Sequence, residues 1–86
     1  MYSKTVVVSN ELGLHARPAS IFVIQAKKFK SEITIQMDDK TLNAKSMAAI
    51  LGACIDKGTE LRLTANGEDE QEAVDSLITT IKNNLE

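Results

Sequence analysis

The segment from Gly13 to Ser20, which reads GLHARPAS, holds the residues of this chain best suited to chemistry. His15 is the only histidine in the sequence, and Arg17 and Pro18 follow it closely. Proline fits the first turn of a helix, because the amide hydrogen that it lacks would have no intrahelical acceptor there. His15 is therefore predicted to lie at or just before a helix N-terminus.

That position would make His15 a good phosphoryl acceptor. First-turn amides, those of Ala16 and Arg17 if the helix starts early, are unpaired and carry partial positive charge that attracts phosphate oxygens. The guanidinium of Arg17 adds a permanent cation whose planar fork suits the same oxygens. Both features disfavour the imidazolium, so we expect the pKa of His15 to fall below about 6.5 and a ring nitrogen to be free to attack.

The side chains that hydrolysis would require are missing from the sequence. With one histidine and one cysteine, neither a Ser-His-Asp set nor a cluster of metal ligands can be assembled. We therefore expect a carrier without enzymatic turnover, metal or other cofactor. Two alternatives remain open: His15 as a plain surface or capping residue, and an acylphosphatase-like hydrolase in which Asn10 orients water near Arg17.

Composition indicates one small domain spanning residues 1–86, with 43% hydrophobic residues but only one Tyr and two Phe. The net charge of −2 and the scarcity of aromatic rings argue against nucleic acid as a partner. Cys54 lies alone in an apolar helical stretch, so it is predicted to be a buried, inert thiol in a reducing compartment. Without a leader or an apolar run of membrane length, we expect a cytoplasmic protein with no direct membrane insertion.

Hydrophobic periodicity predicts the elements that must position the histidine segment. Strands are predicted from β-branched or alternating runs at residues 5–8, 32–37, 40–43 and 61–65. Helices are predicted from about 16 to 29, within 47–55, and after Asp69, which has capping-box spacing with Glu72. Such amphipathic strands indicate an antiparallel sheet with one solvent-exposed face and one face covered by helices.

The histidine segment, extended to Leu12 as LGLHARPAS, resembles the active-site signature of the HPr family, the histidine-containing phosphocarriers of the bacterial sugar phosphotransferase system. The resemblance continues through NAKS at 43–46, KGT at 57–59 and GEDEQEA at 67–73. It implies an α+β open-faced β-sandwich, with a four-stranded antiparallel sheet and three helices on one face in the order βαββαβα. It also implies that Nδ1 of His15 takes a phosphoryl group from phosphoenolpyruvate through enzyme I and passes it to IIA components of sugar permeases.

Ser46 precedes a short apolar stretch and is predicted to be a helix N-cap. A phosphate there would be stabilised by the helix amides. The resemblance implies phosphorylation by an ATP-dependent serine kinase and docking of that form on a catabolite-control transcription regulator. In the regulated relatives a bulky Met and a Gly stand where this chain has Ala48 and Ala49, so its apolar patch is smaller. A purely regulatory role through Ser46 is the alternative, although family members restricted to that role lack His15.

A relay protein must also present a surface for transient docking, with an apolar centre and a polar rim. The family's interface matches six positions of this chain on two predicted helices, and we expect these residues to meet the partners: Ser20, Ile24, Lys27, Met47, Ile50 and Leu51. Lys27 and Arg17 would then attract acidic partners and speed association. An exposed active site suits a monomer.

Overall fold

The computed structural model describes residues 1–9, 13–14 and 16–83. Within them the chain forms four strands and three helices in the order β-α-β-β-α-β-α. The elements are β1 (Tyr2–Val7), α1 (Ala16–Ala26), β2 (Glu32–Met37), β3 (Lys40–Asn43), α2 (Met47–Gly52), β4 (Glu60–Asn66) and α3 (Glu70–Asn83). Their number, type and order confirm the predicted α+β architecture.

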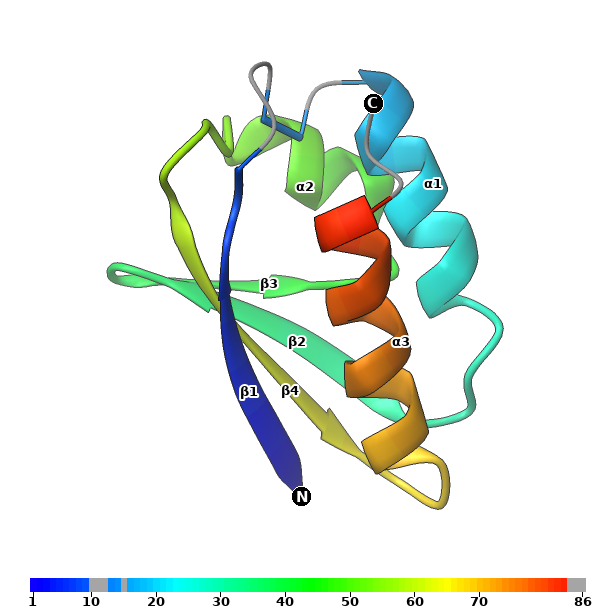
Figure 1. Ribbon diagram of the computed structural model, residues 1–86. Helices are drawn as coiled ribbons and strands as arrows, with labels where there is room; N and C mark the ends of the chain where they lie inside the picture. The colour runs from blue at the N-terminus through cyan, green and yellow to red at the C-terminus, as the bar shows by residue number, and fades with distance from the viewer. Residues whose placement is uncertain (10–12, 15, 84–86) are drawn as a thin grey trace.

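The four strands form one antiparallel sheet with the order β1-β4-β2-β3. All three helices lie on the same side of this sheet, and its other face is left open (Figure 1). Helix α3 packs on β1, β4 and β2, while α2 packs on β3, and α1 contacts both other helices. The arrangement is the predicted open-faced sandwich.

Strict alternation in β2 and β4 explains why only one face is covered. In β2, Ile33 and Ile35 are buried while Glu32 and Gln36 are exposed, and β4 repeats the pattern from Glu60 to Asn66. Successive side chains of a strand point to opposite faces, so each strand presents its apolar set to the helices. Phe22, at the centre of α1, is fully buried among these aliphatic side chains.

Strand β1 begins earlier than its β-branched residues predict, at Tyr2 rather than Thr5. The hydroxyl of Tyr2 and the ammonium of Lys4 both donate to Oδ1 of Asp75 in α3, at 3.1 Å and 2.9 Å. Hydrogen bonding of Lys4 with Tyr2, and next with Asp75, raises the pKa of Lys4 to about 12, and the Lys4 ammonium lowers the pKa of Asp75. A contact across 73 positions of sequence thus extends the strand, and local propensity does not report it.

Helix α1 ends at Ala26, three residues before the predicted end near Phe29. The amides of Lys28 and Phe29 donate to the carbonyls three residues before them, so the last turn tightens and the helix stops. Phe29 still packs against the core from this turn, which explains why its spacing matches the helical stripe.

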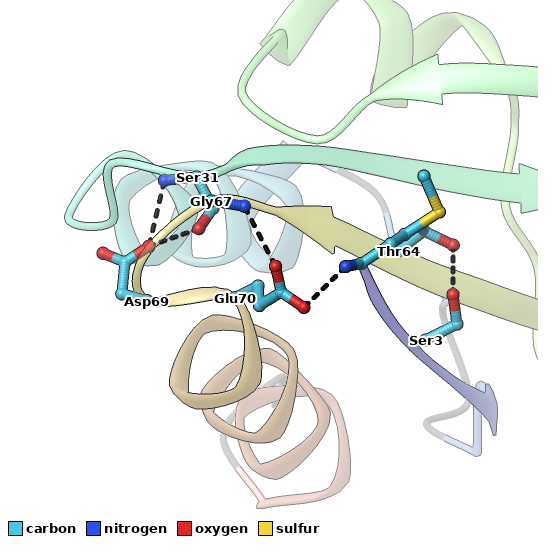
Figure 2. Close-up of polar contacts among 7 residues, drawn as sticks. Ser3, Ser31, Thr64, Gly67, Asp69 and Glu70 are labelled. Atoms are coloured by element: carbon cyan, nitrogen blue, oxygen red, sulfur yellow. Dashed lines mark hydrogen bonds and ion pairs between the residues drawn. The ribbon is translucent and has the colours of Figure 1, made fainter.

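The predicted capping box at the start of α3 is wrong in its partners. The amide of Gly67 donates to Oε1 of Glu70 at 3.2 Å, so the capping contact of a glutamate is made two residues earlier than predicted (Figure 2). The carboxylate of Asp69 turns instead to the α1–β2 connection, where it accepts from the amides of Lys30 and Ser31 at 2.9 Å and 3.0 Å. It also accepts a short hydrogen bond from the Ser31 hydroxyl (Figure 2).

The Asp69 contacts predict an acid-sensitive stability. The Ser31 hydroxyl, followed by the Lys30 and Ser31 amides, lowers the pKa of Asp69 from 3.8 to about 2. Because the folded pKa lies below the unfolded one, this stabilisation is complete above about pH 4 and disappears as pH falls towards 2. We expect Asp69→Asn to lower the Tm by about 5 °C at pH 7, and by progressively less below pH 4.

Thermal unfolding followed by circular dichroism, at about seven pH values from pH 7 to pH 2.5, measures the Tm difference between the wild type and Asp69→Asn. Glu68→Gln is the matched control, because it neutralises the neighbouring carboxylate, which has no hydrogen bond to a described residue. A Tm difference for Asp69→Asn that stays constant over the whole range would contradict the assigned role.

Candidate functional site

The first turn of α1 is the centre of the candidate site. The helix begins at Ala16, which confirms the early start, and Pro18 is its third residue, buried against the core. The side chains of Ala16 and Arg17 are exposed, and no ion pair joins Arg17 to another described residue. The first amides of a helix have no intrahelical partners, and Pro18 has no amide hydrogen that would need one. His15 precedes this turn and lies outside the described residues.

The chain on the other side of His15 is held firmly. Leu14 is only 2% exposed, and its amide donates to the carbonyl of Ile55 at 2.8 Å. Gly13 has a φ of +63° and packs against the same loop. The sequence interpretation missed this support, although a glycine two residues before the histidine was the available signal.

Ser46 is the N-cap of α2, as predicted. Its backbone is extended, with φ −106° and ψ 109°, and its Oγ accepts from the amide of Ala49 at 3.2 Å. Next to it, the ammonium of Lys45 donates to the carbonyl of Phe29 at 2.7 Å, which ties the start of α2 to the α1–β2 connection. Ser46 itself is half-buried, and Ala48 beside it is exposed.

The structure brings most of the predicted docking residues to the surface of adjacent helices. Ile24 of α1 is 58% exposed and Leu51 of α2 is 39% exposed, so both large aliphatic side chains are available to a partner. Lys27 is exposed just beyond α1, while Ser20 and Met47 are half-buried. Helices α1 and α2 pack against each other, so these five residues lie on, or just beyond, two neighbouring helices (Figure 1). We call them the docking face.

Ile50 was predicted to belong to this face, and that prediction is wrong. Its side chain is fully buried in the hydrophobic core and offers no surface to a partner. Helix α2 has six residues, so it turns only one apolar side to the core, and Ile50 occupies that side while Leu51 faces outward.

The prediction for Cys54 is also corrected, because its thiol is exposed rather than buried. Helix α2 ends at Gly52, so the helical spacing that placed Cys54 in the core does not extend to it. Cys54 has a φ of +52°, a left-handed conformation that reverses the chain direction after the helix.

The described residues contain no group of three or more His, Cys, Asp or Glu side chains that could hold a metal ion. Among the same residues, the carboxylates with lowered pKa values lie at the β1–α3 contact and at the start of α3, away from α1's first turn. No helix of the described part of the chain is long and apolar enough to cross a membrane.

Comparison with known proteins agrees with this geometry. The family model described as "PTS HPr component phosphorylation site" matches residues 2–83. The chain is 46% identical over 81 residues to the phosphocarrier protein HPr of Haemophilus influenzae, covering 94% of this chain and 95% of the relative.

Solved structures show the same similarity. The structure of HPr from Thermoanaerobacter tengcongensis superposes with a TM-score of 0.92 at 41% identity, covering 95% of this chain and 92% of that one. The structure of Crh from Bacillus subtilis, a catabolite repression protein described as a dimer with a swapped domain, has a TM-score of 0.77 at 38% identity. This match covers 100% of this chain and 99% of Crh.

Proposed function

The chain belongs to the HPr family of phosphocarriers in the phosphotransferase system, and we propose that His15 is the residue that carries its phosphoryl group. The observation that carries this proposal is the placement of α1. Its first residue, Ala16, directly follows His15 in the chain, so the histidine is covalently attached to a helix N-terminus. Unpaired amides and the exposed Arg17 are then available for the phosphoryl oxygens.

In the proposed transfer, neutral His15 attacks the phosphorus of a phosphohistidine on enzyme I, which was itself phosphorylated by phosphoenolpyruvate. The lone pair of Nδ1 forms the new N–P bond, and the donor nitrogen leaves with the electrons of the old one. No proton needs to move when the phosphorylated ring of the donor carries a proton on its other nitrogen. The donor then leaves as neutral imidazole, and the His15 ring, which keeps its Nε2 proton, takes over the positive charge. Arg17 and the Ala16 amide stabilise the oxygens as charge is passed on.

A second transfer then returns the carrier to its starting state. The same N–P bond breaks when a histidine of a IIA component attacks, so the protein cycles without catalysing a net reaction by itself. Water must be a poor competitor in both steps, and the sequence offers no second histidine as a base to activate it. The chain therefore acts as a relay rather than an enzyme.

The docking face gives the partners a place to bind beside the acceptor. Ile24 and Leu51 supply apolar surface, and Lys27 and Arg17 supply positive charge at its edge. A small interface of this kind suits the weak, short contacts of a protein that must leave each partner quickly. We therefore propose a cytoplasmic monomer as the working form, with enzyme I and IIA components as acidic partners of this face.

A regulatory role at Ser46 is a second proposal, supported by the similarity to Crh and by the accessible edge of the half-buried N-cap. The phosphoserine would be made by a serine kinase/phosphorylase and would dock on a catabolite-control transcription regulator. Because Ser46 lies at the start of α2, its phosphate would stand next to the docking face and add negative charge there.

Phosphoryl transfer to His15 is tested by mixing the protein with phosphoenolpyruvate and purified enzyme I and recording its intact mass. We expect one acid-labile, base-stable phosphoryl adduct, absent in His15→Ala. Arg17→Ala should still be phosphorylated but about tenfold or more slowly, because it loses one cation from the oxyanion environment. An adduct that survives His15→Ala would refute the assignment.

The docking face is tested with Ile24→Glu, which places a carboxylate at its apolar centre. We expect the half-saturating concentration of the carrier for enzyme I to rise about tenfold while the saturating rate changes less than about twofold. Val7→Glu is the matched control, since Val7 is 52% exposed and points to the open face of the sheet, opposite the helices. Equal effects of the two substitutions would argue against a localised docking face.

Regulation at Ser46 predicts ATP-dependent labelling of the protein in a native extract of its host. The label should be stable to acid, unlike phosphohistidine, and should be lost in Ser46→Ala. Ser3→Ala serves as the control, because Ser3 lies in β1 and its hydroxyl bonds only to Thr64 among the described residues. Labelling that persists in Ser46→Ala would remove this proposal.

A further inference from the structure

The α2–β4 loop, residues 53–59, is hydrogen-bonded to both ends of the segment that connects β1 to the histidine. At one end, the amide of Val8 donates to the carbonyl of Thr59 at 2.9 Å, and the amide of Gly58 donates to the carbonyl of Val8 at 2.7 Å. At the other end, the amide of Leu14 donates to the carbonyl of Ile55 at 2.8 Å. The loop thus binds Val8 at one end and Leu14 at the other through backbone hydrogen bonds.

The loop is itself fixed to the core at the point where it meets Leu14. Ile55 and Leu14 are each 2% exposed, so their side chains anchor the two backbones in the same hydrophobic cluster. Interiors are close-packed, and a carbonyl carried by such an anchored residue has little freedom to move. The position of the Ile55 carbonyl is therefore set by the core and not by the histidine segment.

Gly13 makes the tightest contact of this arrangement. A Cβ at this residue would lie 2.2 Å from the Ile55 carbonyl oxygen and 2.8 Å from the Cα of Asp56, both of them backbone atoms. Its φ of +63° lies in the left-handed region, which glycine adopts without steric cost. Any other residue at this position must push the loop and the histidine segment apart.

We propose that Gly13 is a positioning residue for phosphoryl transfer, because its contact with the Ile55–Asp56 backbone sets where the chain enters α1. This inference rests on the proposed function of His15. Leu14 and Ala16 are the covalent neighbours of the acceptor, and Leu14 is placed by the Ile55 carbonyl. A displacement of about 1 Å at a reacting group can cost about a hundredfold in rate, so the contact acts on transfer and not only on stability.

The test compares three glycine-to-alanine variants in transfer from phosphorylated enzyme I, at a temperature where each is folded by NMR. Gly13→Ala carries the clash at the candidate site. Gly67→Ala carries a comparable clash, 2.6 Å from Oγ and 2.7 Å from Cα of Ser31, but at the β4–α3 turn, at the opposite end of the molecule (Figure 1). Gly52→Ala adds a methyl group that meets no atom within 4 Å and controls for the chemical change.

We expect Gly13→Ala to lower the saturating rate of phosphoryl transfer at least tenfold with a half-saturating concentration within about twofold of the original. Gly67→Ala should lower the Tm yet keep the saturating rate, and Gly52→Ala should change neither greatly. A Gly13→Ala rate equal to that of Gly67→Ala at matched stability would overturn the proposal. Wild-type protein that takes no phosphoryl group would instead overturn the proposed function.

If Gly13→Ala does not fold, an amide-to-ester replacement between Gly13 and Leu14 decides the question. This change removes the single hydrogen that Leu14 donates to Ile55 and leaves every side chain in place. The proposal predicts a saturating rate about tenfold below that of the unmodified synthetic protein, with half-saturation unchanged. An unchanged rate would show that the contact is only structural.

Discussion

A sheet whose strands alternate strictly can bury only one face, and the rest of this structure depends on that constraint. Ile33, Ile35 and the matching residues of β4 all turn to the same side, so the three helices must share that side to cover them. Because three helices share one face of the sheet, α1 packs against both α2 and α3. The adjacency of α1 and α2, on which the docking face depends, is therefore a consequence of how the sheet is patterned.

The two ends of the helical layer have different roles. At the end where α3 begins, Asp69 and Asp75 make the hydrogen bonds that join the helix to the α1–β2 connection and to β1. At the other end, the Ile55 carbonyl holds the amide of Leu14, two residues before α1, and Arg17 in the first turn is exposed. The contacts of Asp69 and Asp75 thus lie away from the positive terminus of α1, where a carboxylate would compete with phosphate.

Local signals in the sequence were enough for the elements whose contacts are local. Strands β2 and β3 have the predicted bounds, because alternation and an Asp38-Asp39 turn specify a hairpin without outside help. The strand order β1-β4-β2-β3 is not contained in any such signal, and the start of β1 depends on Asp75. Ile50 and Cys54 were misplaced for one reason: a six-residue helix is too short for its periodicity to define a face.

The histidine segment likewise combines features that local sequence predicts with a feature that depends on distant residues. Residue types and spacing predicted a helix that starts near residue 16, but the need for glycine at position 13 becomes visible only when Ile55 and Asp56 are in place. The sequence could not reveal that the backbone of one loop supports another. Nearly every residue carries the same backbone donor and acceptor, so residue type does not indicate which of them pair. The family was predictable from the motifs along the chain, whereas the contact that supports the histidine segment was not.

The central claim is that a single ring nitrogen, that of His15, holds the phosphoryl group between two partners. It is tested most directly by ³¹P NMR of the phosphorylated protein, with the phosphorus signal correlated to ¹⁵N-labelled histidine. The account predicts one phosphoramidate signal coupled to Nδ1 of His15, which disappears when a IIA component is added. A signal coupled to no histidine nitrogen, or one that persists after that addition, would contradict it.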